Sequence, residues 1–414
     1  MTGDDLVFHA VCDLTAQVRG RGVPLLDYEL HPERGTGWVP ANQSLTAFGP
    51  LAEETTFDAV GELRLRPDPS TRARIELGDA SPLDLVLCDV AEQDNSDWSA
   101  CARTYCRDAL AELTRETGLS LIGSFEHEFT IVDGAEWRPF LLGEVRRREP
   151  LLPLIARGMR QAGCEPENLL PEYGAGQFEL TSKPTAALAA ADRSVLTRVV
   201  TGEVARLLGL NATFSPVVVV DGIGNGVHVH FGLVEASGAP AGIGAVGMSF
   251  AAGVLRHIRA LTALSAASPV SFLRLKPHRW SAATAALGRA NREAALRIAG
   301  QGPSEHLEYR AADATACPYL TLGGLVHAGL AGIRDGLPAP ELLERDPSNM
   351  SAAELEGFTP LPTSLEEALD ELRADSLGLP PLLLDTYIGL KHAELALCDG
   401  LDDAARVERY IDVF

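Results

Sequence analysis

The sequence lacks the cysteine patterns that mark a disulfide framework or a zinc site. Its 414 residues include seven cysteines, scattered singly and without a CxxC pair. An odd set of isolated cysteines is typical of reduced thiols, so we expect a cytoplasmic protein.

Signals for secretion and membrane insertion are also missing. The opening residues, MTGDDLVFHA, have neither the basic region nor the apolar stretch of a signal peptide. The most lipid-like stretch, 239–255, is rich in Gly and Ala rather than Leu, and Arg256, His257 and Arg259 follow it closely. We expect a buried helix there and no membrane partner.

Positive charge is scarce. Lys and Arg number 35 against 57 Asp and Glu, which gives a formal net charge of −22. This balance argues against nucleic acid and anionic membranes as partners, but it leaves small-molecule substrates open. The hydrophobic fraction of 46% is that of a globular protein with a sizeable core.

The hydrophobic pattern changes near residue 100. Before it, 6–15 and 83–90 have the character of strands, and after it a helix over 97–117 carries an apolar stripe. We therefore predict an α+β protein with a β-rich module at 1–100 and a second domain at 101–414. Further helices are expected over 150–162, 185–208, 242–267, 319–335, 364–374 and 382–397, and strands around 174–182 and 212–233.

The segment GSFEHEFTIVD, residues 123–133, is a strand with two unlike faces. Phe125, Phe129 and Ile131 share one face, whereas Glu126 and Glu128 share the other, about 7 Å apart. Like charges so close repel and are costly to bury, so the two carboxylates are expected to face a cation.

The same alternation recurs in three later segments. The polar pairs are Gln177 and Glu179 in PEYGAGQFELTS, His228 and His230 in GIGNGVHVHFGL, and Glu308 and Arg310 in EHLEYRAAD. A polar face on one strand is most often exposed to solvent. Four such strands that carry glutamates and histidines instead favour a site for Mg²⁺ or Mn²⁺.

A sheet face that gathers two such ions is typical of phosphoryl transfer, where arginines offset the developing charge. The segments FLRLKPHRW and GRANREAALRI supply Arg274, Arg289, Arg292 and Arg297. Structural salt bridges are the alternative explanation for each of these arginines.

Taken in order, these motifs resemble those of the glutamine synthetase family over most of the chain. SFEHEF matches its paired-glutamate strand, PEYGAGQFEL its E-V-G-P-G-Q-x-E, and GNGVHVHFGL its G-S-G-M-H-x-H-x-S-L. HLEYRAADATACPYL matches R-I-E-x-R-x-P-D-x-x-x-N-P-Y-L, and GELRLRPDPSTR and LVLCDV match the N-terminal module.

The resemblance implies a fold and an activity. The fold is an N-terminal β-grasp module plus a catalytic domain with a curved antiparallel sheet and surrounding helices. The activity is that of an ATP-dependent carboxylate–amine ligase, in which the γ-carboxylate of glutamate is phosphorylated and an amine displaces the phosphate. The implied cofactors are ATP and two Mg²⁺ or Mn²⁺ per site, and the implied assembly is a homo-dodecamer of two hexameric rings with active sites between subunits.

The resemblance also implies roles for the polar side chains. It gives one metal ion to Glu128, Glu172 and Glu179, and the other to Glu126, His228 and Glu308. It places His230 and Arg297 at the nucleotide, Arg274 and Arg310 at the carboxylates of the acid, and Arg292 at the transferring phosphoryl group.

The sequence departs from the ammonia-using enzymes where they bind ammonium. Their glutamate six residues after the arginine is here Trp280, although Arg274 and Arg292 keep the family spacing. Their N-terminal D-G-S-S segment has no clear match, and the comparable TGWVPANQSLTAFG contains no acidic residue. An indole would offer a wall to an organic amine, or it would turn into a core.

Other departures concern the acid and the nucleotide. Ile223 replaces an Asn that the ammonia enzymes often have near the amino group of glutamate, and His306 replaces an Arg near the nucleotide. We therefore predict a γ-glutamyl-amide ligase for glutamate or a related acid and an organic amine, with an uncharged or apolar amine favoured over a polyamine. The alternatives are a glutamine synthetase with a rearranged ammonium site, and a non-catalytic family member, which would be expected to lack metal ligands that are all present here.

Overall fold

The N-terminal module is built on a mixed sheet. The computed structural model describes residues 5–53, 57, 60–78, 81–351 and 353–414. The strands are β1 (Leu6–Cys12), β2 (Val18–Pro24), β3 (Thr36–Trp38), β4 (Leu63–Pro67), β5 (Ala73–Ile75) and β6 (Leu83–Ala91). They lie in the order β2-β1-β6-β4-β3, with β5 paired to β6, and β1 runs parallel to β6. Helix α1 (Leu25–Leu30) directly follows β2.

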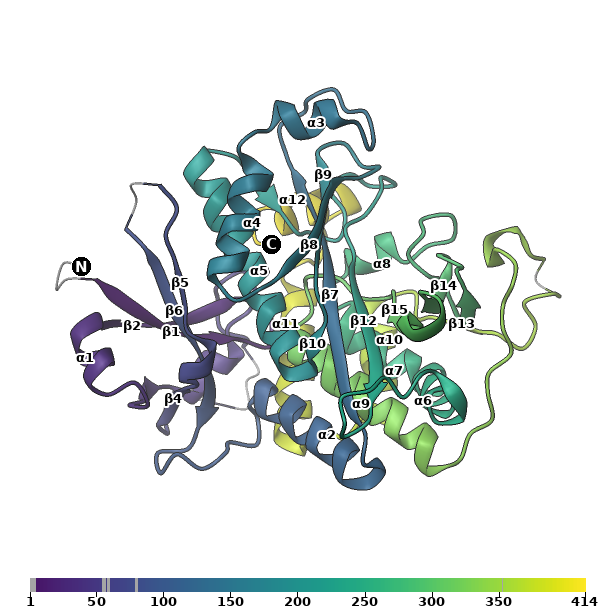
Figure 1. The fold of residues 1–414 in the computed structure, drawn as a ribbon, viewed down its shortest axis with the longest axis horizontal. Coiled ribbons are helices and arrows are strands. Elements are labelled where there is room, and N and C mark those ends of the chain that lie inside the picture. Colours follow the sequence, from purple (N-terminus) through teal and green to yellow (C-terminus); the bar gives the residue numbers. More distant parts are fainter. Residues whose placement is uncertain (1–4, 54–56, 58–59, 79–80, 352) are drawn as a thin grey trace.

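A larger, curved sheet forms the centre of the second domain (Figure 1). Its order is β16-β13-β14-β15-β12-β7-β9-β8, and β10 and β11 also pair with β7. The strands are β7 (Ser120–Ile131), β8 (Pro166–Pro171), β9 (Gln177–Ser182), β10 (Thr185–Ala186), β11 (Ala212–Thr213), β12 (Val227–Val234), β13 (Thr284–Arg289), β14 (Ala294–Ala299), β15 (His306–Tyr309) and β16 (Thr359–Pro360). The pair β13–β14 is parallel, whereas β7, β9, β12 and β15 are joined by antiparallel pairs.

Helices surround this sheet and separate it from the N-terminal module (Figure 1). They are α2 (Ala102–Thr117), α3 (Leu142–Arg147), α4 (Leu151–Gln161), α5 (Ala187–Leu208), α6 (Gly244–Arg256), α7 (Ile258–Ser265), α8 (Ser271–Arg274), α9 (Pro318–Arg334), α10 (Leu365–Ala374), α11 (Pro381–Ala396) and α12 (Asp403–Ile411). Among the described residues, no helix combines the length and the apolar character needed to cross a membrane. The architecture confirms the predicted fold class.

The central strand β7 has one face in the core and one face in the site. Phe125 and Phe129 are buried, and the Phe129 ring stacks on Phe178 of β9 with centroids 5.6 Å apart. Helix α5 packs along this strand, where Ser194 lies 2.9 Å from His127. Polar and apolar residues alternate along this strand because every second side chain packs against this apolar layer.

Several boundaries differ from the sequence prediction. The first long helix begins at Ala102 rather than at residue 97, after a turn in which the Cys101 amide donates to the Trp98 carbonyl. The helix predicted over 242–267 is divided at His257 into α6 and α7. The sequence does not predict β13 and β14, because nearly all of their residues are buried and no polar–apolar alternation marks them as strands.

A buried charge network joins the N-terminal module to the second domain. Arg103 of α2 is 4% exposed, and it donates to Asp68 and Asp89 of the module and to Asp192 of α5. These bonds measure 2.8 to 3.0 Å. A buried ion pair contributes little beyond an apolar equivalent, but removal of one partner leaves the others uncompensated.

We therefore predict that Arg103→Ala lowers the free energy of unfolding by about 3–5 kcal/mol. Arg115→Ala on the same helix is the matched control, because its side chain is 69% exposed; it should cost less than about 1 kcal/mol. Denaturant unfolding at one protein concentration measures both, and equal losses in the two variants would contradict the role given to the network.

Candidate active site

The polar face of the larger sheet lines a cavity of about 760 Å³. Strand order explains why residues from distant segments meet there, since β9, β7, β12 and β15 are consecutive neighbours. The cavity wall includes eleven of the thirteen side chains that the sequence predicted: Glu126, Glu128, Glu172, Glu179, Ile223, His228, Arg274, Trp280, Arg292, Arg297 and Arg310. Glu308 and His230 are not part of this lining, but they contact residues of it: Glu308 Oε1 lies 3.7 Å from His228 Nδ1, and His230 Nε2 lies 3.3 Å from Glu126 Oε2.

Three carboxyl groups gather at one end of this wall. Glu128 of β7 is directly opposite Glu179 of β9, and Glu172 follows the end of β8. Burial, followed by the charges of Glu126, Glu128 and Glu172, raises the pKa of Glu179 to about 9. Burial likewise raises the pKa of Glu128 and of Glu172. An all-oxygen cluster that resists ionisation fits a hard divalent cation, which would restore the charged forms.

A second group contains two carboxylates and two imidazoles. His228 is opposite Glu126 and His230 is opposite Glu308 in the strand register. The Nδ1 atom of His228 lies 2.7 Å from Glu126 Oε1, and the Nε2 atom of His230 lies 3.3 Å from Glu126 Oε2. Possible ligand atoms of Glu126, His230 and Glu308 all lie within 4.8 Å of one another, so this group also fits a divalent cation.

Arginines hold Glu308 in its ionised form. Glu308 is completely buried and pairs with Arg297 and Arg310. Although burial opposes ionisation, these cations and the neighbouring imidazoles hold the pKa of Glu308 below its usual value. Burial, followed by the charge of Arg310, lowers the pKa of His228 to about 4, so this imidazole is neutral and able to bind a metal.

Arg274 presents an unpaired donor to the cavity. Its Nη2 atom donates to the Arg310 carbonyl at 3.1 Å, whereas its buried Nη1 atom has no hydrogen-bond partner among the described residues. A Cβ atom at Gly224 or Gly226 would come within 2.8 Å of this side chain, so these glycines give it room. An unpaired buried guanidinium N–H is suited to an anion such as a carboxylate.

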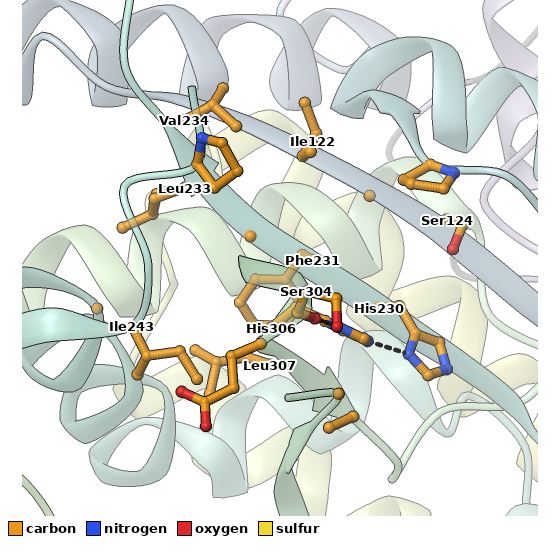
Figure 2. A pocket seen from close by; sticks show the side chains of 18 of the residues that line it. Ile122, Ser124, His230, Phe231, Leu233, Val234, Ile243, Ser304, His306 and Leu307 are labelled. Atoms are coloured by element: carbon orange, nitrogen blue, oxygen red, sulfur yellow. Dashed lines mark hydrogen bonds between the residues drawn. The ribbon is translucent and has the colours of Figure 1, made fainter. Parts of the chain in front are cut away.

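A second cavity of about 590 Å³ meets the first at Glu126 and Arg297, which line both. Figure 2 shows its apolar side chains, among them Phe231, Leu233 and Ile243, and the pair His230 and His306 at its edge. A cavity with apolar walls that ends at acidic and basic groups fits a nucleotide, with its base between the walls and its phosphates at the charged end.

Trp280 stands at the wall of the first cavity in an uncommon backbone conformation. Its φ is 54°, a region that bulky residues seldom adopt. Both of its backbone polar groups are held, since its N–H donates to Glu293 at 2.8 Å and its carbonyl accepts from Arg310 at 2.9 Å. The side chain is 48% exposed, so the alternative of a Trp turned into a core is wrong.

Two further aromatic residues extend the Trp280 wall, and the sequence did not reveal them. The Tyr173 ring meets Trp280 edge-on with centroids 4.8 Å apart, and Phe140 meets Tyr173 in the same way at 4.8 Å. Tyr173 directly follows the predicted site residue Glu172, so its position in the sequence could have indicated that it lies near the site. Phe140 comes from a loop whose course the local sequence does not predict.

Comparison with known proteins identifies the class. The family model for the glutamine synthetase catalytic domain matches residues 99–410, and that for the glutamine synthetase N-terminal domain matches residues 3–98. The chain therefore belongs to the glutamine synthetase family, and it has the catalytic domain of an ATP-dependent carbon–nitrogen ligase. The division into domains at residue 100 stays a prediction.

Three relatives illustrate the likeness. A gamma-glutamylpolyamine synthetase, GlnA3, from Streptomyces coelicolor is 35% identical over 95% of this chain and 90% of its own. A crystal structure of a novel glutamine synthase homolog is 40% identical with a TM-score of 0.90, covering 100% of this chain and 99% of the other. A GmaS/ADP complex is 25% identical with a TM-score of 0.85, covering 97% and 95%.

The acidic cluster predicts a pH-dependent response to metal. Because the pKa of Glu179 is raised to about 9, its protonated form contributes stability below the unfolded value, and this contribution is lost as pH rises toward 9. Because a metal ligand must be deprotonated, Mn²⁺ should raise the Tm more at pH 8 than at pH 6. Glu179→Gln should reduce both the rise in Tm and its dependence on pH. In the wild type, Mn²⁺ at 100 times its Kd should raise the free energy of unfolding by about 2.7 kcal/mol.

Thermal unfolding with and without Mn²⁺ at the two pH values checks this prediction. Glu408→Gln on an exposed position of α12 is the control and should behave as wild type. A full metal-induced gain in Glu179→Gln at both pH values would contradict the assignment of Glu179 to a cation.

Proposed function

We propose that the protein is an ATP-dependent ligase that joins the γ-carboxyl group of glutamate, or of a related acid, to an organic amine through an acyl phosphate. The observation that carries the proposal is that Trp280 lines the same cavity as Glu126, Glu128, Glu172, Glu179 and His228, at the position where the family resemblance places an ammonium-binding glutamate. Family membership supports the ATP and metal dependence.

The two adjoining cavities support separate places for nucleotide and acceptor. ATP would occupy the cavity of Figure 2, and the acid and amine would occupy the larger one, so that the phosphates meet the acid near Glu126 and Arg297. One Mg²⁺ or Mn²⁺ would be held by Glu128, Glu172 and Glu179. A second would be held by Glu126, His228 and Glu308. Such ions, when bound, offset phosphate charge and polarise the oxygens that react.

The arginines of the site would bind and orient the acid. Arg274 would donate a hydrogen bond from its unpaired Nη1 atom to a carboxylate of the acid. Arg310 is held in place by hydrogen bonds to Glu308 and to the Trp280 and Arg292 carbonyls. Arg292 lines the same cavity, where its charge would offset that of the phosphoryl group in transfer. Ile223 also lines this cavity and offers no polar contact to the amino group of glutamate. The acid substrate could therefore be glutamate or a related acid.

The amine would enter against Trp280, Tyr173 and Phe140. Each of these three residues is about half exposed, so their rings offer an apolar surface to the amine. None of them supplies the carboxylate with which the ammonia-using enzymes bind ammonium. This wall favours an apolar or aromatic amine.

A polyamine is the second candidate. It is favoured by two observations: Glu344 and Asp346 line the same cavity, and the Streptomyces relative is a gamma-glutamylpolyamine synthetase. By the same family likeness we propose a homo-dodecamer of two rings, with each site completed by the neighbour's N-terminal module.

Phosphate release from ATP with glutamate and a panel of amines tests the function. We expect release with benzylamine or an alkylamine to exceed release with ammonium at least tenfold in kcat/KM, with the γ-glutamyl amide found by mass analysis. Greater release with putrescine would support the second candidate. Release that depends on ammonium alone would contradict an organic amine and point to a rearranged ammonium site.

Substitution of Trp280 tests its role in amine choice. Trp280→Glu removes the apolar wall and restores a carboxylate, so the ratio of kcat/KM for the preferred amine to that for ammonium should fall about 10- to 100-fold. Trp280→Phe keeps an aromatic ring and is the matched control, with a small change expected. An unchanged ratio in Trp280→Glu would exclude Trp280 as a specificity residue.

A further inference from the structure

Arg279 lines the larger cavity together with the arginines that we propose to bind the acid. Its side chain is 25% exposed, and its Nη1 atom donates to the carbonyls of Asp221 and Gly222, the latter at 3.0 Å. Its Nη2 atom donates to Asp221 Oδ1 at 3.4 Å. The described residues thus use three of the five N–H hydrogens of this guanidinium, which holds it in place and leaves two hydrogens for a ligand.

The loop 221–226 holds Arg279 and Arg274 at the same part of the cavity. Arg279 contacts the first two residues of this loop. Arg274 packs against Gly224, where a Cβ atom would come within 2.8 Å of its side chain. Ile223 lies between these contact points in the chain and also lines the cavity. An acid that pairs with Arg274 would therefore meet an apolar side chain and a second guanidinium.

The hydrogen-bond acceptors of this loop already accept bonds from the protein. The carbonyls of Asp221 and Gly222 accept from Arg279, and the Asp221 carboxylate accepts from the same guanidinium. The Gly224 carbonyl accepts from Gln177 Nε2 at 2.8 Å. An ammonium group has three donor hydrogens and no acceptor, so it would have to compete with these bonds.

The charges near the loop also oppose a cation. Arg274 Nη2 donates to the Arg310 carbonyl at 3.1 Å, so a third guanidinium adjoins this part of the cavity. The carboxylate of Glu128 accepts from the Gly226 amide at 2.6 Å and belongs to the group that we propose to hold a divalent cation. An ammonium group against Arg279 would meet like charge, whereas a hydroxyl group could accept from its remaining hydrogens.

We propose that Arg279 selects the acid substrate, and that this acid is a five-carbon dicarboxylate whose α-carbon carries a neutral substituent instead of a free ammonium group. The inference rests on the proposed function, because it concerns the acid that the ligase would join to the amine. One carboxylate of the acid binds at Arg274, and its α-carbon faces Arg279 and Ile223. Arg279 is a specificity residue in this arrangement and touches no reacting atom.

Isothermal titration calorimetry of the full chain with ADP and Mg²⁺ tests this choice of acid without turnover. L-2-hydroxyglutarate is the decisive ligand, because it replaces the ammonium group of L-glutamate with a hydroxyl group of similar size. We expect it to bind about 10- to 100-fold more tightly than L-glutamate, since like charges in contact oppose binding. Glutarate, which has only hydrogen at this carbon, should also bind more tightly than L-glutamate.

Substitutions of Arg279 test whether it makes the selection. Arg279→Gln removes the positive charge and should lower the ratio of the L-2-hydroxyglutarate affinity to the L-glutamate affinity about 10-fold. Arg279→Lys keeps a positive charge and should retain more of this ratio. Lys276→Gln is the matched control, because Lys276 pairs with Asp221 at 3.8 Å but is not among the residues that line the cavity. Its ratio should match that of the wild type.

Binding of L-glutamate as tight as that of L-2-hydroxyglutarate, or tighter, would overturn the inference. An unchanged ratio in Arg279→Gln would overturn it too, as would a wild-type protein that binds neither acid. Phosphate release with the same acids and the amine panel is measured separately. If L-glutamate binds more tightly and yields the amide, this inference fails and the proposed function stands. If L-2-hydroxyglutarate binds more tightly through Arg279 but no pair of acid and amine supports phosphate release, the proposed function fails instead.

Discussion

The repulsion among carboxylates on one sheet face is the constraint on which the site depends. Glu126 and Glu128 lie on β7 and Glu179 lies on the neighbouring β9, and all three side chains line the same cavity. The opposite face is held by buried aromatic packing that includes Phe129 and Phe178. The strands therefore cannot turn these acids away without exposing that core. Without a metal ion, burial and this repulsion raise the pKa of Glu128, Glu172 and Glu179, and a bound divalent cation would relieve the repulsion in the ionised state.

Beside this fixed acidic face lies a loop whose aromatic residue, Trp280, lines the same cavity. The loop around Trp280 includes further residues with positive φ, His278 at 63° and Ala282 at 77°. Such conformations persist when the surroundings hold them, as Glu293 and Arg310 hold the backbone of Trp280. The side chains that we propose to bind metal and the aromatic wall are thus linked through Arg310, which donates to the Trp280 carbonyl and also pairs with Glu308.

Much of the site was predictable because a strand alternates with a period of two. That period assigns Glu126 and Phe125, and likewise His228 and Val229, to opposite faces of their strands without any knowledge of which strands are neighbours. Contacts across strands required the register, which local sequence does not contain, so the approach of His306 to His230 was missed. Phe140 and Tyr173 were missed because loop geometry brings them to Trp280. The division of α6 from α7 at His257 also has no clear signal in the apolar pattern.

Crystals grown with ADP and Mn²⁺, measured at the manganese absorption edge, test the central claim most directly. The account predicts two anomalous peaks on the polar face, one among Glu128, Glu172 and Glu179 and the other between Glu126 and Glu308 with an imidazole nitrogen as a ligand. An ordered nucleotide with neither peak at these carboxylates would contradict it.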